Sequence, residues 1–156
     1  MKHRVVYIAH RLNSPTREGI EKNRADASKW VGWLAREFDI APIADWIVLT
    51  GQWDESLRER GLAIDLALIE RADEVWLVGP RVSEDMSIEA AHAMRLGKPV
   101  HDLTGLGSVS VAEENSGEQR RYIAALLAGK TETEALESAR AQPEESSPAH
   151  FGEGAG

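Results

Sequence analysis

A short, uninterrupted apolar run near the middle of the chain constrains the fold most strongly. Residues 74–79 read Glu-Val-Trp-Leu-Val-Gly, with no polar residue between the first and the last position. A half-exposed strand alternates apolar and polar residues, whereas a strand covered on both faces reads as a continuous apolar run. The sequence therefore predicts a buried strand at 74–79, in a parallel sheet that helices cover on both sides.

The rest of the chain alternates between strand and helix patterns. Residues 4–9 form a β-branched and aromatic run that predicts a first buried strand, and apolar residues spaced by three, four and seven predict a helix over about 16–38. A second strand is expected within 40–49, with Pro42 and Gly51 obscuring its ends. The remaining elements expected from capping and breaking residues are helices at 54–71 and 83–96 and a strand at 99–103.

Alternating strands and helices with short connections indicate an α/β fold. We expect a flavodoxin-like or Rossmann-like three-layer sandwich with a four- to five-stranded parallel sheet. Residues 1–141 are expected to form a single domain, which would include two further helices at 118–127 and 131–140. Residues 142–156 are mostly Pro, Glu, Ser and Gly and predict a disordered C-terminal tail.

The composition excludes several classes of function. The chain has no cysteine, which suits a cytoplasmic protein, and its opening apolar run is too short for a signal peptide or membrane span. A net charge of -8, with 26 acidic and 18 basic residues, argues against binding polymeric nucleic acid. The histidines lack metal-ligand spacing, and no dinucleotide or P-loop motif is present. We therefore expect a small-molecule ligand, with no metal, cofactor or membrane.

Two acidic residues occupy positions where an apolar side chain is expected. Glu89 lies three residues after Met86 on the apolar face of its predicted helix, and Asp65 is the only polar residue between Leu62 and Ile69. A buried, unpaired carboxyl group tends to retain its proton and suits acid-base chemistry in a pocket. Two such groups on neighbouring helices meet the needs of glycoside cleavage.

Plainer explanations fit these two residues equally well at this point. Glu89 reads as a solvated helix glutamate, and Asp65 as a structural aspartate satisfied by backbone groups or by Arg58 or Arg81. In α/β sheets, however, ligands bind beyond the carboxyl ends of the strands. His10 and Gly79 lie at two of these ends.

Three stretches resemble the nucleoside 2-deoxyribosyltransferase family, particularly its little-characterised bacterial and phage-borne branch. They are Tyr7 near the end of the first strand, the stretch Asp65-x7-Asp73-Glu-Val-Trp, and the turn Ser83-Glu-Asp-Met-Ser-Ile-Glu89 before Gly97-Lys-Pro-Val. The similarity extends over about residues 4–104. It implies cleavage or transfer of the N-glycosidic bond of 2'-deoxynucleosides, without a metal or cofactor.

The resemblance also implies individual roles. Glu89 matches the nucleophile that attacks C1' of the sugar, Asp65 matches the aspartate that manages the proton of the base, and Tyr7 matches the tyrosine that orients the nucleophile. Ser83 stands where such transferases place a second aspartate. The substrate-contacting residues expected with these three catalytic residues are Ser83, His10, Arg11, Trp53, Gly79, Arg81 and Met86.

Several alternatives stay open. Asp85 stands where relatives usually carry glycine, and its charge beside Glu84 favours a nucleoside over a nucleotide. A deoxynucleoside 5'-monophosphate N-hydrolase would need Arg11, Arg17 or Arg81 for the phosphate. A non-catalytic nucleotide-binding sensor would also retain the fold. From the resemblance we expect a homo-oligomer, a dimer or larger, in which the segment after Leu103 contributes to the neighbour's pocket.

Overall fold

The structure is a computed structural model that describes residues 3–52, 58–104 and 116–141. The chain divides into two compact units, Met1–Ser116 and Gly117–Gly156. Within the described ranges, no helix is long and apolar enough to cross a membrane. The predictions for Trp53 and for the tail at 142–156 lie outside the described residues.

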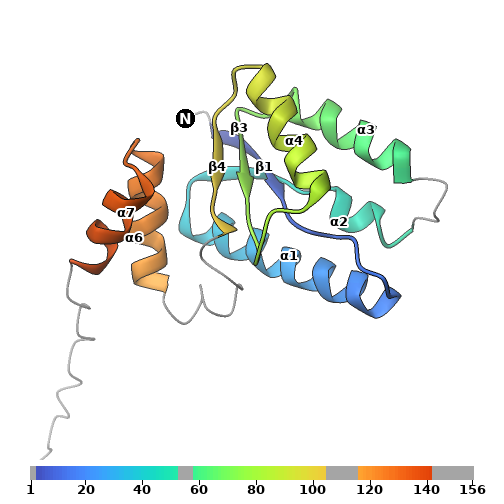
Figure 1. The fold of residues 1–156 in the computed structure, drawn as a ribbon, viewed down its shortest axis with the longest axis horizontal. Coiled ribbons are helices and arrows are strands. Elements are labelled where there is room, and N and C mark those ends of the chain that lie inside the picture. Colours follow the sequence, from blue (N-terminus) through green and yellow to red (C-terminus); the bar gives the residue numbers. More distant parts are fainter. Residues whose placement is uncertain (1–2, 53–57, 105–115, 142–156) are drawn as a thin grey trace, which may run out of the picture. The chain divides into compact units, whose positions relative to one another are not determined.

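Four parallel strands form the sheet of the first unit, in the order β2-β1-β3-β4 (Figure 1). Tyr7 of β1 pairs with Ile43 of β2 on one side and with Val75 of β3 on the other. The chain runs from β1 to β2 and then crosses to β3, so its direction reverses at β1, as in flavodoxin-like sheets. This confirms the predicted α/β class. The strands are β1 (Arg4–Ala9), β2 (Ile40–Ile43), β3 (Glu74–Leu77) and β4 (Val100–Asp102).

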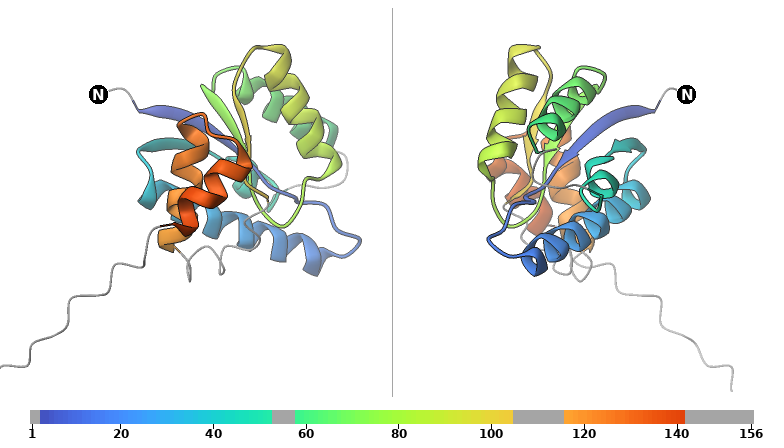
Figure 2. Two further views of the ribbon diagram at one scale, coloured as in Figure 1. Left: turned by 60° about the vertical axis from the view of Figure 1, so that its left-hand side comes forward. Right: turned by 90° about the vertical axis from the view of Figure 1, so that its right-hand side faces the viewer.

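Helices pack on both faces of this sheet (Figure 2). On one face, Tyr7 and Leu77 join a buried cluster with residues of α3 (Arg58–Ile69) and α4 (Glu84–Arg95). Because side chains alternate along a strand, their neighbours point to the opposite face, towards α1 (Arg17–Glu37). The predicted three layers are therefore helix, sheet and helix.

The face of the sheet towards α1 is packed with aromatic rings. Trp30 and Trp33 of α1 lie edge to face with ring centroids 5.9 Å apart, and Phe38 continues the series to Trp76 of β3 at 6.2 and 5.8 Å. Such edge-to-face contacts add roughly 0.5–1.5 kcal/mol each beyond the burial of the rings. Three of the five tryptophans therefore stabilise this side of the core.

The segment Trp46–Leu49, expected as part of the second strand, instead forms a short helix, α2. The helical turn brings Trp46 into the core, with 4% of its surface exposed, and its indole N–H donates to the Ile8 carbonyl at 3.0 Å. Arg24 of α1 donates to the Ile47 carbonyl at 2.8 and 3.0 Å. A four-residue apolar run cannot distinguish a strand from a helical turn, and these two buried contacts decide the outcome.

Capping residues begin the two long helices α1 and α4, and a glycine follows the second. The Thr16 hydroxyl accepts from the Gly19 N–H at the start of α1, and the Ser83 hydroxyl accepts from the Met86 N–H at the start of α4. Gly97, with a φ of +71°, follows the end of α4. The predicted boundaries of α1 and α4 are therefore confirmed to within a residue or two.

The second unit contains α6 (Ser116–Leu127) and α7 (Glu132–Arg140). The Arg121 guanidinium of α6 donates to the Ala139 carbonyl near the end of α7 at 2.9 and 3.1 Å. Thr131 and Glu134 form a capping box at the start of α7. The two helices predicted after residue 115 are thus present.

Candidate active site

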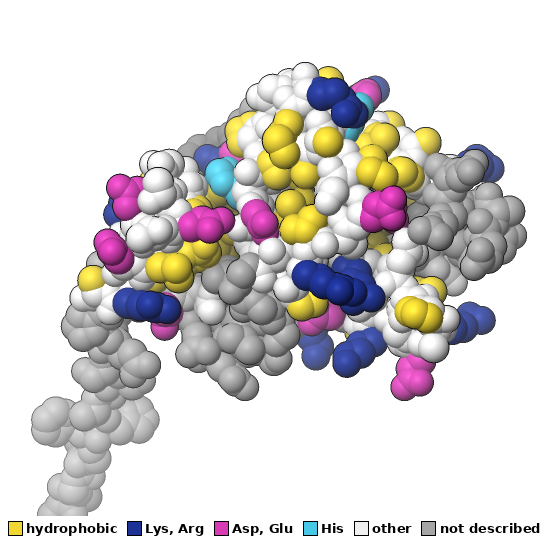
Figure 3. All heavy atoms as spheres, viewed as in Figure 1, with side chains coloured by type: hydrophobic (Ala, Val, Ile, Leu, Met, Phe, Trp, Pro, Cys, Tyr) yellow, Lys and Arg dark blue, Asp and Glu magenta, His cyan; other side chains and the backbone are white. Residues whose placement is uncertain are grey.

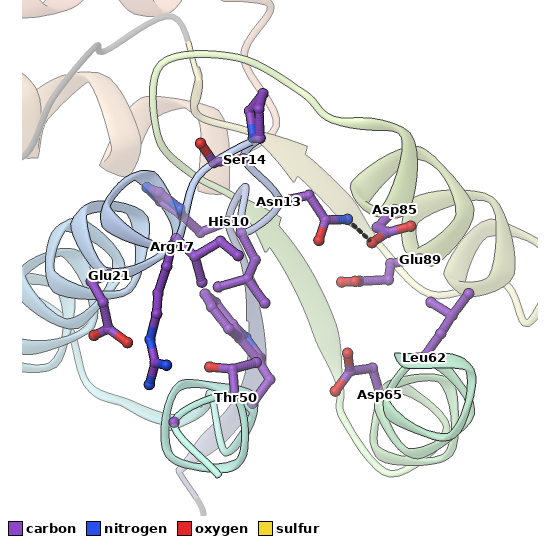
Figure 4. A pocket seen from close by; sticks show the side chains of 15 residues that line it. His10, Asn13, Ser14, Arg17, Glu21, Thr50, Leu62, Asp65, Asp85 and Glu89 are labelled. Carbon is purple, nitrogen blue, oxygen red and sulfur yellow. Dashed lines mark hydrogen bonds between the residues drawn. The ribbon is translucent and has the colours of Figure 1, made fainter. Parts of the chain in front are cut away.

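A cavity of about 760 Å³ opens at the carboxyl edge of the sheet (Figure 4). Its walls come from the loop after β1 and from α1, α2, α3 and α4, so it lies where the connectivity reverses beside β1. Ligands of doubly wound sheets bind at this position, and the volume falls within the usual range for small-molecule sites. The polar and charged side chains that line it include those of His10, Asn13, Arg17, Asp65, Asp85 and Glu89.

Glu89 and Asp65 line the same wall of this cavity. Glu89 lies on α4 and Asp65 on the neighbouring α3, and Figure 4 shows both carboxyl groups directed into the cavity. Only 6% of Glu89 and 8% of Asp65 is exposed, and one carboxyl oxygen of each is buried without a hydrogen-bond partner in the described structure. Unsatisfied buried polar atoms are costly, so their convergence here indicates a site that a ligand completes.

The hydroxyl of Tyr7 lies within reach of both carboxyl groups. Tyr7 is completely buried on β1, and burial followed by the charges of Glu89 and Asp65 raises the pKa of its phenol well above the usual value. The nearby hydroxyl partly lowers the pKa of each acid, although it forms no hydrogen bond at full geometry with any described residue. Its contact with the two acids is therefore loose. We call Tyr7, Asp65 and Glu89 the carboxylate–tyrosine cluster.

Burial sets the protonation of the two acids. It raises the pKa of Glu89 from 4.5 to about 8, with the negative charge of Asp65 as the next cause. It also raises the pKa of Asp65 from 3.8 to about 7, with the charge of Asp45 as the next cause. Asp85 contributes to both increases. Near neutral pH the cluster therefore holds protons that it can exchange with a ligand.

Asp45 affects the carboxylate–tyrosine cluster electrostatically, and the sequence analysis did not single it out. It follows the end of β2 by two residues, and its charge raises the pKa values of both Asp65 and Tyr7. Its Oδ1 atom is buried and has no partner in the described structure. The sequence feature that could have indicated Asp45 is its position just beyond the carboxyl end of a strand, where ligands of such sheets bind.

His10 supports the floor of the cavity. Its Nδ1 lies 2.6 Å from the Arg11 carbonyl oxygen and its Nε2 lies 2.7 Å from an Asp26 carboxylate oxygen. Each ring nitrogen therefore faces an oxygen at hydrogen-bonding distance. Only 1% of the His10 side chain is exposed. Its nitrogens are thus already occupied, which places it as a structural support for the loop after β1.

Gly79 leaves the room that the His10 ring occupies. A Cβ atom at this position would lie 2.8 Å from two atoms of the ring, and the backbone φ of Gly79 is +99°. Both the contact and the dihedral angle require glycine. The positive φ lies just beyond β3, which ends at Leu77 and not at residue 79 as expected. Gly79 therefore affects the cavity indirectly, by leaving space for the His10 ring.

Four other residues expected to contact substrate, Ser83, Met86, Arg11 and Arg81, do not line this cavity. The Ser83 hydroxyl caps α4, and Met86 is buried in the core with 1% of its surface exposed. An adjoining hollow of about 380 Å³, which we call the second hollow, is lined by Arg11, Arg81 and Ser83. Across the described residues, no group of three or more His, Asp or Glu side chains is arranged to hold a metal ion.

These features define a parallel α/β domain with a cavity of small-molecule size, lined by carboxyl groups, at its switch point. A family model described as a domain of unknown function, DUF7768, matches residues 4–103. The chain therefore belongs to the DUF7768 family. The match spans all four strands and contains every residue of the carboxylate–tyrosine cluster. No curated protein and no solved structure gives a significant match to the chain.

Proposed function

We propose that this protein cleaves or exchanges the N-glycosidic bond of 2'-deoxynucleosides, with Glu89 as the attacking carboxylate. One observation carries the proposal: two buried carboxyl groups, each with a partnerless oxygen, line one cavity, and the buried Tyr7 hydroxyl interacts with both of them. The similarity of Tyr7, Asp65 and Glu89 to residues of nucleoside 2-deoxyribosyltransferases supports the same reaction.

The reaction divides into two balanced steps. In the first, a Glu89 oxygen bonds to C1', the bond from C1' to the base nitrogen breaks with its electron pair on the base, and Asp65 donates its proton to the base. In the second, a new base or water attacks C1', gives its proton to the Asp65 carboxylate, and releases Glu89. A pKa of about 7 allows Asp65 to act in both directions near neutral pH.

Tyr7 has a separate task in this scheme. Glu89 must be ionised to attack, whereas burial favours its protonated form. The Tyr7 hydroxyl lowers the pKa of Glu89, but burial outweighs this effect in the structure. A full hydrogen bond donated by Tyr7 in the ligand complex would favour the carboxylate and orient one of its oxygens. Binding of a ligand would close the remaining distance between these loosely arranged groups.

A second candidate function is hydrolysis of deoxynucleoside 5'-monophosphates. The observation in its favour is the second hollow, because Arg11 and Arg81 line it beside the cavity. Guanidinium groups bind phosphate well. The negative charges of Glu84 and Asp85 in the same hollow oppose a phosphate, and for this reason we place the nucleoside reaction first.

The deciding experiment incubates the purified protein with a panel of 2'-deoxynucleosides and their 5'-monophosphates, each with and without a second free base. New nucleosides would identify a transferase and free base alone a hydrolase. Glu89→Gln should reduce turnover by more than about 1000-fold. Glu84→Gln, an exposed acid on the same helix, is the matched control and should retain most of the rate. Ligand binding without turnover would refute the catalytic role and favour a sensor.

A further inference from the structure

One hydrogen bond separates the cavity from the second hollow. The Asn13 amide Nδ2 donates to an Asp85 carboxylate oxygen at 3.1 Å, and thereby joins the loop after β1 to the first turn of α4. Both residues line the cavity, and both also line the second hollow. Figure 4 shows this bond at the side of the cavity that contains Glu89. We call the Asn13–Asp85 pair the partition.

The two spaces differ in charge. The cavity is lined by the acids Glu21, Asp65, Asp85 and Glu89 together with Arg17, whereas the second hollow is lined by Arg11 and Arg81 together with Glu84 and Asp85. In the described structure neither guanidinium forms an ion pair, and Arg11 uses its Nε–H to donate to the Asn13 carbonyl at 3.3 Å. Figure 3 shows basic side chains gathered on the face between the start of α4 and α1. An anionic group that passed the partition would therefore meet Arg11 and Arg81, with Glu84 and Asp85 beside them.

The partition lies next to the place where a sugar would bind. Asp85 precedes Glu89 by four residues on α4, so the two side chains lie one above the other on one face of the helix, with Cβ atoms about 5–6 Å apart. A sugar whose C1' contacts Glu89 would bring its other substituents within reach of Asp85. Because Asn13 and Asp85 line both spaces, a phosphate on that sugar would reach Arg11 and Arg81 only past this pair.

We propose that the Asn13–Asp85 partition determines specificity by confining the ligand to the cavity and keeping a 5'-phosphate from Arg11 and Arg81. The inference rests on the proposed function and names its substrate class: unphosphorylated 2'-deoxynucleosides. Two effects act together, since the paired side chains block the passage and the Asp85 carboxylate repels an anion. Opening the partition should admit the 5'-monophosphate.

Three variants separate the barrier from the charge. Asn13→Ala removes the hydrogen bond and leaves every charge in place, Asp85→Asn removes the charge and retains a side chain of the same size, and Asp85→Ala removes both. Asn13 is exposed and Asp85 is half-buried at the surface, so the fold should tolerate each change. The quantity to measure is the ratio of the dissociation constants of one 2'-deoxynucleoside and its 5'-monophosphate, obtained by titration calorimetry.

The wild type should bind the nucleoside more tightly than the monophosphate. Asn13→Ala should shift the ratio towards the monophosphate by about 10-fold or more, and Asp85→Ala should shift it further, because an added contact between phosphate and arginine corresponds to at least a factor of ten. Adding Arg81→Gln to Asp85→Ala should remove most of the gain. A gain that survives this second change would place the phosphate elsewhere and overturn the inference.

Other outcomes also refute the partition, in ways that can be distinguished. An unchanged ratio of dissociation constants in Asn13→Ala would show that the hydrogen-bonded pair is no barrier. This holds even if Asp85→Asn shifts the ratio, because that shift would come from the charge alone. Tighter binding of the monophosphate by the wild type would show that phosphate is already accepted. If neither ligand binds to any of the proteins, the proposed function fails together with the inference. If the nucleoside binds with an unaltered ratio, the inference alone fails.

Discussion

Replacing Glu89 with glutamine should stabilise the protein increasingly as the pH rises. Glu89 is 6% exposed, and burial raises its pKa from 4.5 to about 8. When the pKa of an acid is higher in the folded state, the unfolded chain loses the proton first as the pH increases. Between pH 4.5 and about 8, deprotonation therefore favours the unfolded chain of the wild type, and above that range the loss is complete.

The expected magnitude follows from the width of this range. Each pH unit contributes about 1.4 kcal/mol, so the range from 4.5 to about 8 corresponds to about 5 kcal/mol. Glu89→Gln lacks this titration. The buried amide of glutamine also loses hydrogen bonds to water, at a cost of roughly 1–3 kcal/mol at every pH. The pH-dependent part of the difference between variant and wild type is thus the quantity that tests the reasoning.

Urea unfolding followed by tryptophan fluorescence, from about pH 5 to about pH 8, measures this difference. The matched control is Glu84→Gln, because Glu84 is exposed on the same helix. We expect the free energy of unfolding of Glu89→Gln to rise relative to wild type by several kcal/mol across the range, and that of Glu84→Gln to stay within about 0.5 kcal/mol. Parallel curves for Glu89→Gln and wild type would refute the claim that burial controls this carboxyl group.

Two further substitutions test the packing around the cavity. Gly79→Ala should lower the free energy of unfolding by about 2–4 kcal/mol, since it combines a positive φ with a contact at 2.8 Å to the His10 ring. The control Gly97→Ala, at a φ of +71° with nothing within 4 Å, should cost only about 1 kcal/mol. Equal losses of stability in chemical denaturation would contradict the role of His10. Tyr7→Phe removes a buried hydroxyl that has no hydrogen-bond partner in the described structure, so the free energy of unfolding should change by less than about 1 kcal/mol or increase. Nucleoside turnover, followed by chromatography of the products, should fall at least about 10-fold. An unaltered rate would exclude Tyr7 from the reaction.

Local patterns predicted most of the fold. The apolar run at 74–79, the cap Ser83 and the periodic helices each depend on neighbouring residues, and such signals survive in the structure. The segment Trp46–Leu49 was predicted wrongly because its conformation depends on Ile8 and Arg24, which lie far away in the sequence. Short apolar segments carry too little periodicity to settle such a choice.

The candidate site was predictable only in part, for a similar reason. Asp65 and Glu89 stand out because an acid interrupts an apolar helix face, which is visible in a single segment. Asp26, by contrast, lies on α1 among other polar residues, and only the fold shows that it binds His10. The pairing of Asn13 with Asp85 spans 72 positions of sequence. Neither contact leaves a local pattern.

The loop after β1 is anchored before any ligand arrives. His10 is held between Asp26 and the Arg11 carbonyl, the Asn23 amide donates to the Leu12 carbonyl at 2.9 Å, and Asn13 binds α4. A binding loop that is already ordered loses little conformational entropy when it closes around a small molecule. Ligand affinity in this cavity would then depend mainly on the contacts formed. Removing the side chain of Asp26 or Asn23, neither of which lines the cavity, should reduce affinity without altering a group that touches the ligand.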